Sequence, residues 1–299
     1  MNITKIFAPS RRKQLIAVLF VLPALIIHAS IVTIPSLSTV YMSFFEWNGL
    51  GNAAFIGLDN FIELFTKDNV FWVAVTNNLK WALIFITVPI IIAVPVASVL
   101  RKVGRGQMLY RTLFFLPYVV APAVAGKIFS AYYNPINGIS QIFRQLGWES
   151  LANIDFLGNP KIALYAVAVV DNWHWWGFVM VLMLSALHQV DPALYEAAKV
   201  EGANKWQEFR YITIPGIRPT LFFIVMMTII WSFLQFDYIW VMTMGGPAQS
   251  TEILSTWMYK NAFVNYRAGY ANAICVIQSF ICVFTYFALR FMQKRGWDV

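Results

Sequence analysis

Six long apolar segments restrict what this sequence can fold into. Each is long enough to cross roughly 30 Å of hydrocarbon as an α-helix. They cover residues 15–36, 70–100, 109–131, 161–188, 219–241 and 268–292. Backbone polar groups find no water inside a bilayer, so such segments must form helices with internal hydrogen bonds. The sequence therefore predicts an all-α, polytopic membrane protein with six transmembrane helices.

The composition agrees with this class of protein. Only 12% of the 299 residues are charged and 59% are hydrophobic, whereas a soluble domain of this length carries roughly twice the charged fraction. The formal net charge of +8 is compatible with nucleic-acid binding. However, the basic residues lie beside apolar segments and do not cluster on a soluble surface. We therefore expect membrane lipid around the chain and no nucleic-acid partner.

The start of the chain has the outline of a signal sequence. Lys5 and the basic group at 11–13 precede an apolar run at 15–34. That run is too long for the apolar region of a cleaved signal, and it has no small-x-small cleavage site. We therefore expect an uncleaved first span.

The distribution of Lys and Arg predicts the orientation. Fifteen of the 22 basic residues lie at the two ends of the chain and in the connections 101–111 and 189–219. The positive-inside rule places these parts in the cytoplasm. The expected organisation is a cytoplasmic N-terminus at 1–14, a multi-pass transmembrane domain at 15–292 and a cytoplasmic C-terminus at 293–299.

The connection 189–219 is the longest polar stretch between apolar segments. Asp191–Pro192 has the pattern of a helix start, with a side-chain acceptor ahead of proline. Gly202 permits a sharp turn, and Pro215 and Pro219 predict that no uninterrupted helix continues beyond the turn. The sequence therefore predicts two short helices, hinged at Gly202, on the cytoplasmic face.

No catalytic constellation is recognisable. The three histidines, His28, His174 and His188, are far apart along the chain, and no Cys/His cluster has metal-ligand spacing. The sequence also has no Gly-Lys-Ser/Thr loop that would hold a phosphate. We expect no metal, no catalytic residue and no cofactor in this chain.

Several polar residues are predicted to lie deep in the membrane. Asp171, Trp231 and Gln278 each fall ten residues into their span from its outer end, which is about 15 Å of helix. A polar side chain at that depth is costly unless it faces a water-filled cavity or another polar group. Such residues are therefore candidates for a binding site.

Helical spacing places further residues on the same faces. The candidates on the fourth span are Asp171, His174, Trp175 and Phe178, and those on the fifth are Trp231, Gln235 and Tyr238. Aromatic faces beside hydrogen-bonding groups suit a sugar, whose C–H faces stack while its hydroxyls need partners. The alternative is that these aromatic residues only pack helices together and that Asp171 or Asp237 bonds a neighbour.

The cytoplasmic segment closely resembles the EAA loop of binding-protein-dependent ABC importer permeases. The matching residues are Glu196, Ala197, Ala198, Glu201, Gly202, Ala203, Phe209, Ile212, Ile214, Pro215 and Pro219. The family most often has Asp where this chain has Glu201, and both residues are acidic. The resemblance implies the type I ABC importer permease fold, with this loop between the fourth and fifth of six spans.

Other motifs resemble the carbohydrate-uptake branch of that family, which includes the maltose and glycerol-3-phosphate permeases. They are Phe55-x-Gly57-Leu58-x-Asn60-Phe61, Leu116-Pro117-Tyr118, and Gly245-Gly246-Pro247 followed by Thr251. The resemblance implies a bacterial or archaeal inner (plasma) membrane. It also implies four kinds of partner: a second, non-identical permease, two copies of an ABC ATPase, an extracytoplasmic sugar-binding protein and a saccharide. ATP and Mg would be used by the ATPase, against which the EAA segment forms a coupling helix.

The resemblance also implies a location for the sugar site. Asp171, His174, Trp175, Phe178, Trp231, Ser232 and Gln235 fall where the maltose permease lines its site, and Tyr118 matches through Leu-Pro-Tyr. With Tyr238 and Gln278 these are the predicted substrate-binding residues. A phosphate would require Arg or Lys there, so a neutral or weakly basic saccharide is favoured.

Two alternatives remain at this point. The first is import of glycerol-3-phosphate or another polyol by the same architecture. The second is an integral membrane enzyme acting on lipid or glycan, with Asp171 and Asp237 as paired acids. The enzyme predicts activity without nucleotide and gives no reason for the cytoplasmic segment.

Overall fold

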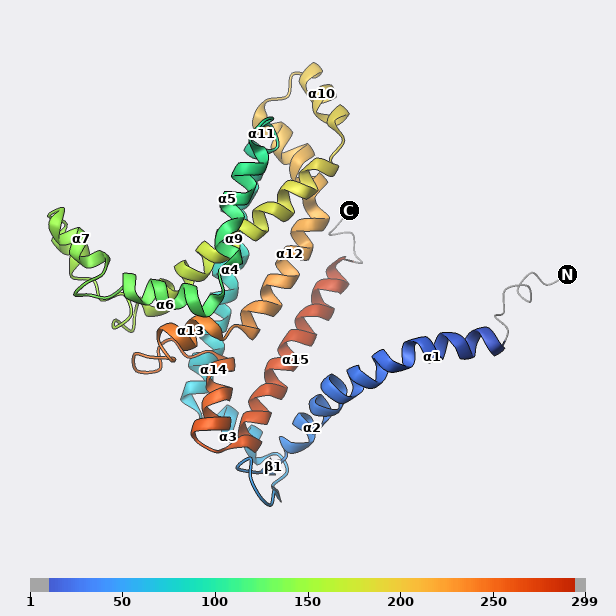
Figure 1. Cartoon of the computed structure of the whole chain (residues 1–299), viewed down its shortest axis with the longest axis vertical. Helices are drawn as coiled ribbons and strands as arrows, with labels where there is room; N and C mark the ends of the chain where they lie inside the picture. The colour runs from blue at the N-terminus through green and yellow to red at the C-terminus, as the bar shows by residue number, and fades with distance from the viewer. Residues whose placement is uncertain (1–10, 294–299) are drawn as a thin grey trace.

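The computed structural model describes residues 11–293, and helices dominate this part of the chain (Figure 1). The long helices are α1 (Arg11–His28), which continues through a π-helical turn (Ala29–Thr33) into α2 (Ile34–Met42), α4 (Asn69–Leu100), α9 (Ala163–Gln189), α12 (Ile214–Leu234) and α15 (Ala268–Met292). Most of both predicted tails, 1–14 and 293–299, lies outside the described residues.

Shorter elements connect the long helices. They are α3 (Asp59–Thr66), α5 (Gln107–Val119), α6 (Pro122–Tyr132), α7 (Ile139–Gln145), α8 (Glu149–Ala152), α10 (Pro192–Val200), α11 (Lys205–Glu208), α13 (Asp237–Met242) and α14 (Leu254–Tyr259), with π-helical turns at Phe209–Thr213 and Lys260–Val264. A two-residue strand β1 (Phe45–Glu46) pairs antiparallel with β2 (Ala54–Phe55). The predicted all-α class is confirmed.

Within residues 11–293, five helices are long and apolar enough to cross a membrane, and the pair α5 and α6 makes a sixth candidate. The expected continuous span at 109–131 is wrong in form, because α5 and α6 meet at an angle of 88°. Val120 and Ala121 are extended at the break and Pro122 begins α6. Proline disfavours helical geometry in the residue before it, which accounts for the position of the break.

The centre of the bundle is the packing of α4 against α9. Trp81 and Ala93 on α4 and Val167, Met180 and Met183 on α9 are all almost completely buried in one apolar cluster. α12 packs on both helices, and α5 packs on α9. Small side chains such as alanine let membrane helices approach closely.

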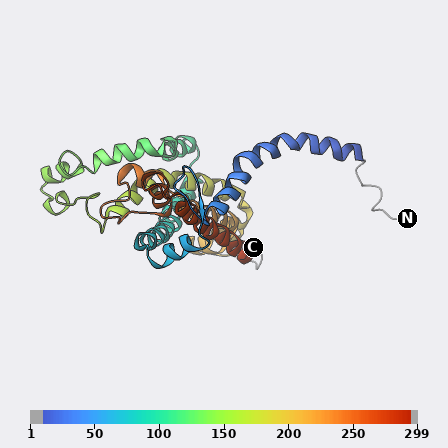
Figure 2. The same ribbon diagram turned by 90° about the horizontal axis from the view of Figure 1, so that it is seen from below.

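The first helix stands apart from this bundle. In both views α1 extends away from the other helices, and α6 and α7 extend on the opposite side (Figures 1 and 2). None of the apolar window within Val18–Met42 is buried. Within the described chain, this span therefore gains no stability from the core formed by α4 and α9.

The segment 189–219, predicted to be cytoplasmic, has the predicted hinge but a different continuation. Gly202 has φ +78° and separates α10 from α11. Pro215 and Pro219 do not interrupt the helix, which is continuous over Lys205–Leu234. A π-helical turn accommodates Pro215, because Ile214 N–H donates to the Phe209 carbonyl with one residue more than an α-turn uses.

The outer end of the bundle is fixed by buried amide side chains of α4. Asn77 Nδ2 donates to the Ser250 and Glu252 carbonyls at 2.8 and 2.9 Å. Asn78 Nδ2 donates to the Ser232 carbonyl at 2.7 Å, and Asn78 Oδ1 accepts from Leu254 N–H at 2.9 Å. These bonds hold the end of α12 and the following loop against α4.

A buried carboxylate stabilises the same loop. Glu252 is completely buried, accepts from Thr256 Oγ1 at 2.7 Å and forms an ion pair with Lys260. At the rim, Arg267 donates to Glu63 at 2.7 Å, and this hydrogen bond raises the pKa of Arg267. The outer connection is therefore held by charged and polar contacts from several elements.

The close contact between α5 and α9 gives a testable consequence. A methyl group at Gly177 on α9 would overlap the backbone carbonyl of Phe114 on α5. We expect Gly177→Ala to destabilise the protein by about 1–3 kcal/mol, the usual cost of overpacking, as measured by thermal unfolding in detergent. Gly104→Ala is the matched control, because nothing lies within 4 Å of a methyl group there. Equal unfolding temperatures for the two variants would contradict this packing.

Candidate functional site

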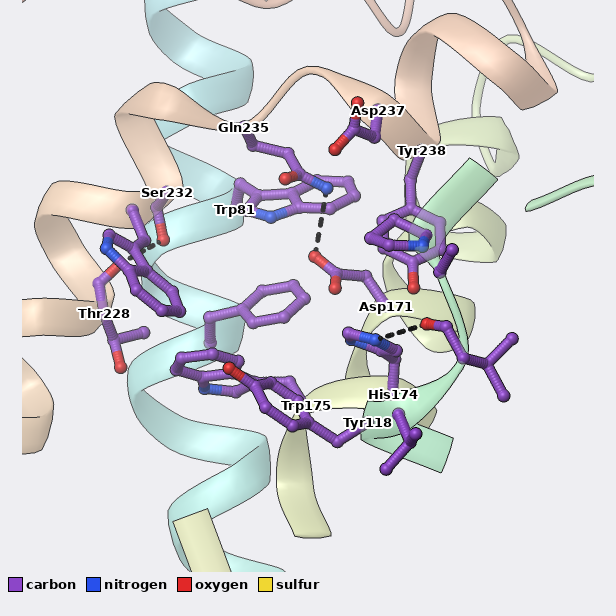
Figure 3. Close-up of a pocket in the computed structure, with 16 residues that line it drawn as sticks. Trp81, Tyr118, Asp171, His174, Trp175, Thr228, Ser232, Gln235, Asp237 and Tyr238 are labelled. Atoms are coloured by element: carbon purple, nitrogen blue, oxygen red, sulfur yellow. Dashed lines mark hydrogen bonds between the residues drawn. The ribbon is translucent and has the colours of Figure 1, made fainter. Parts of the chain in front are cut away.

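A cavity of about 450 Å³ lies between the two breaks in the helices of the bundle, at α5–α6 and at α12–α13. Its walls come from α4, the break between α5 and α6, the middle of α9, and the junction of α12 with α13 (Figure 3). Eight of the ten predicted substrate-binding residues line it: Tyr118, Asp171, His174, Trp175, Trp231, Ser232, Gln235 and Tyr238. These eight residues, which lie up to 120 positions apart in the sequence, thus meet in one cavity.

The two helix breaks supply the polar part of the walls. At the first break, His174 Nε2 donates to the Val120 carbonyl at 3.1 Å. Because a carbonyl only accepts, Nε2 carries the hydrogen of this bond. At the second break, α12 ends at Leu234 and Gln235 adopts an extended conformation. At both breaks the chain leaves the helical conformation, so that polar backbone and side-chain groups can face a solute in the cavity.

One hydrogen bond crosses the cavity wall from α9 to the second break. Gln235 Nε2 donates to Asp171 Oδ2 at 3.1 Å. Asp237 follows in the first turn of α13, on the same rim as Gln235 (Figure 3). The result is a pair of carboxylates beside an amide group, all lining the cavity.

The rest of the wall is aromatic. Tyr118 stacks on Phe178 with ring centroids 4.8 Å apart, and Trp175 lies 4.8 Å from Trp231. On the α4 side, Trp81 stacks on Phe85 at 5.2 Å. Aromatic faces of this kind pack well against the C–H faces of a sugar ring.

The structure adds residues that the sequence reasoning did not include. Trp81, Phe85 and Thr228 line the cavity, as do residues 119–122 at the first break. Trp81 and Phe85 are four residues apart and share one helix face, a signal available in the sequence. The segment 70–100 carries no acidic residue that would mark a polar face beside them.

Two predicted residues do not line the cavity. Phe178 supports it from behind through its stacking on Tyr118. Gln278 is buried on α15, where its Nε2 donates to the Phe233 carbonyl at 2.7 Å and to Ser255 Oγ at 3.1 Å. Its position along the span did not predict the direction in which its side chain points.

The predicted coupling residues lie at the other end of the bundle, around α10 and α11 (Figure 1). Asp191 caps α10 by accepting from Ala193 N–H at 2.9 Å, and Asn204 and Gln207 form a capping box on α11. The exposed residues are Glu196, Ala197, Glu201, Gly202 and Pro215, and the half-buried ones are Ala198, Ala203 and Phe209. The segment is thus a defined, exposed surface.

A second hollow separates this surface from the end of α4. Arg101, Lys102 and Lys199 line it together with Glu196. The Arg101 guanidinium lies 4.6 Å from the centre of the Tyr195 ring, a cation–π contact that ties α10 to α4. The cytoplasmic segment is therefore connected to the bundle by side chains as well as through α12.

These features define a membrane transport subunit, with a solute-sized cavity inside a helical bundle and a capped helical surface at one end. Residues 86–296 match the family described as "Binding-protein-dependent transport system inner membrane component". The chain belongs to this family. The predicted membrane location is thereby confirmed as an inner-membrane component.

Full-length relatives support this assignment. The chain is 35% identical to the probable ABC transporter permease protein YurN of Bacillus subtilis, over 95% of this chain and 96% of that protein. It is 29% identical to the probable starch degradation products transport system permease protein AmyD of Thermoanaerobacterium thermosulfurigenes, over 93% and 94%. It is 30% identical to the sn-glycerol-3-phosphate transport system permease protein UgpA of Agrobacterium fabrum, over 94% and 96%.

The fold matches a solved transporter. A chain of a bacterial ABC transporter involved in the import of the acidic polysaccharide alginate superposes with a TM-score of 0.82 at 22% identity. The match covers 95% of this chain and 96% of that one. The predicted permease fold is confirmed.

The position of Gln278 separates a structural role from a substrate-binding role. We expect Gln278→Leu to lower the free energy of unfolding by about 1 kcal/mol, because the buried Phe233 carbonyl loses its stronger donor. Thermal unfolding of the variant measures this, and Gln141→Leu, at an exposed position on α7, is the control. A changed saccharide preference with normal stability would instead show that Gln278 has a substrate-binding role.

Proposed function

We propose that this chain is the transmembrane permease subunit of an ATP-driven, binding-protein-dependent importer of a saccharide, from a mono- to an oligosaccharide. The observation that carries this proposal is the cavity in which Asp171, Gln235 and His174 lie among aromatic rings. It is large enough for a sugar unit and lies within the membrane-spanning bundle.

The chemistry of the cavity favours a sugar over a polyol phosphate. Among the described residues that line it, none is Lys or Arg, whereas phosphate recognition relies on these cations. The relative UgpA is named as an sn-glycerol-3-phosphate transport system permease. Glycerol-3-phosphate therefore remains the second candidate cargo. The two carboxylates of this chain disfavour an anion, and AmyD provides a related permease for starch degradation products.

The structure offers little support for an enzyme. Asp171 is hydrogen-bonded to Gln235, and the family is one of transport components. An acid pair would need a positioned substrate bond between its carboxyl groups. We therefore assign no catalytic residue to this chain and propose that ATP and Mg are used by separate ATPase subunits.

The complete transporter contains further chains in this proposal. These are a second, non-identical permease, two copies of an ABC ATPase and an extracytoplasmic sugar-binding protein. Both termini and the 189–219 loop face the cytoplasm of a bacterial or archaeal cell. Lys and Arg concentrate at that end of the bundle, as the positive-inside rule requires.

The coupling surface connects to the cavity through one helix. Lys205–Leu234 is continuous over 30 residues, about 45 Å at the rise of an α-helix. Its cytoplasmic end follows Gly202 and α10, and its outer end carries Trp231 and Ser232 in the cavity wall. A displacement of the coupling surface by an ATPase therefore has a stiff path to the cargo site.

The hinge gives a test of coupling. At φ +78° an L-residue is strained even though space is open around Gly202. We expect Gly202→Val to reduce the stimulation of ATPase activity by the loaded binding protein more than Gly202→Asn, because Asn tolerates this conformation better. The measurement is ATP hydrolysis by the reconstituted complex.

Charge reversal tests the surface beside the hinge. We expect Glu196→Lys to lower the same stimulation about tenfold or more, the effect of losing one charge-assisted contact. Glu149→Lys, on the exposed α8, is the matched control. Normal stimulation of ATPase activity in Glu196→Lys would contradict the proposed coupling role of this surface.

The class of cargo is tested in the same complex. The binding protein is loaded in turn with neutral oligosaccharides, monosaccharides and polyol phosphates, and ATPase stimulation and uptake into proteoliposomes are measured. Stimulation and uptake with saccharides alone are the expected result. Uptake of glycerol-3-phosphate without any saccharide would overturn the proposal.

A further inference from the structure

The charge of the cavity narrows the class of saccharide, an inference that rests on the proposed transport of a sugar. We propose that the transported saccharide carries a protonated amino group, which binds between Asp171 and Asp237 against the aromatic wall. Neutral and N-acylated sugars would bind more weakly, and sugar acids and phosphates would be excluded.

The first argument is the absence of a counter-ion for the two carboxylates. Within the described chain, the ion pairs are Lys205–Glu208, Lys260–Glu252 and Arg267–Glu63, and none involves the cavity. The hydrogen-bond donors beside Asp171 are neutral groups, the amide of Gln235 at 3.1 Å and the indole of Trp81. A carboxylate inside a bundle of membrane helices is costly without a positive partner, and an ammonium group would provide it.

The second argument is a set of buried polar groups that lack partners. The Tyr238 hydroxyl, Trp175 Nε1 and Thr228 Oγ1 form no hydrogen bond within the described residues, yet all three residues line the cavity. Tyr238 is only 2% exposed, and its ring lies on the same rim as Asp237 in Figure 3. Buried donors of this kind require an acceptor from elsewhere, and sugar hydroxyls can supply it beside the ammonium.

The third argument is the aromatic wall. The ring centres of Trp175 and Trp231 lie 4.8 Å apart with the rings tilted by 58°, and Trp81 and Phe85 stack on the α4 side. Faces of tryptophan attract ammonium groups through cation–π interaction, whereas they repel anions. Lys127 on α6 is exposed and does not line the cavity, so it does not change the sign of the charge there.

These observations distinguish a cationic sugar from a merely polar one. A neutral saccharide would satisfy the unpaired donors and the aromatic faces. It would leave the half-buried carboxyl group of Asp171 without a positively charged partner at the point where the cargo is bound. An occupant with both hydroxyls and a positive charge suits the hydroxyl donors, the rings and the carboxyl groups together.

The experiment compares sugars that differ only in the amino group. The purified permease–ATPase complex, without binding protein, is titrated with glucosamine and with N-acetylglucosamine, and with the corresponding disaccharides, while tryptophan fluorescence is recorded. We expect the amine forms to bind about 10- to 100-fold more tightly, the effect of one charge-assisted contact. This preference should fall as the pH rises through the pKa of the sugar amine.

Two carboxylate variants and a control separate this contact from a folding effect. Asp171→Asn keeps the shape and an acceptor for Gln235, and should remove most of the preference for the amine form over N-acetylglucosamine. Asp237→Asn, at the exposed rim, should remove a smaller part. Glu149→Gln, on the exposed α8, should behave as the unaltered protein.

The outcomes distinguish this inference from the proposed function. Equal binding of amine and N-acetyl sugars, or a preference that survives in Asp171→Asn, would overturn the inference and leave saccharide import standing. Absence of binding by all of these sugars, together with binding of glycerol-3-phosphate, would overturn both. Tight binding of the amine forms that Asp171→Asn abolishes would establish the site.

Discussion

The structure depends on the satisfaction of backbone groups where membrane helices are interrupted. Within hydrocarbon an unpaired carbonyl or N–H is costly, so irregular backbone is tolerated only where it is buried in protein or lines a cavity. The break after Val119 leaves the Val120 carbonyl free, and His174 donates to it. The end of α12 frees the Ser232 and Phe233 carbonyls, which accept from Asn78 and Gln278.

This constraint explains why the cavity lies where it does. Polar side chains enter the bundle to satisfy the two breaks, and the space between the breaks is lined by the residues that they expose. The same interruption of α12 that places Gln235 and Asp237 on the rim is held rigidly to α4 through Asn78. The helix ends, the buried polar side chains that bond to them and the wall of the cavity therefore depend on one another.

Much of this could be predicted from the sequence. Apolar length predicted the spans, and Asp191 and Gly202 marked the short helices of the 189–219 segment because capping and positive φ are local effects. Interruptions were harder to predict. Pro122 marks a break and Pro219 lies within a continuous helix, because tertiary packing and π-helical turns decide which proline ends a helix. Likewise, the position of Gln278 along its span did not predict that its side chain points towards Phe233 and Ser255.

The π-helical turn at Phe209–Thr213 sets the rotational phase of the helix that follows it. One additional residue in a helix turns everything beyond it by about 100° around the axis, because an α-helix has 3.6 residues per turn. Without that residue, α12 would present a different stripe of side chains to α4 and α9. The extra residue thus determines that Trp231 and Ser232, rather than their neighbours, form the wall of the cavity.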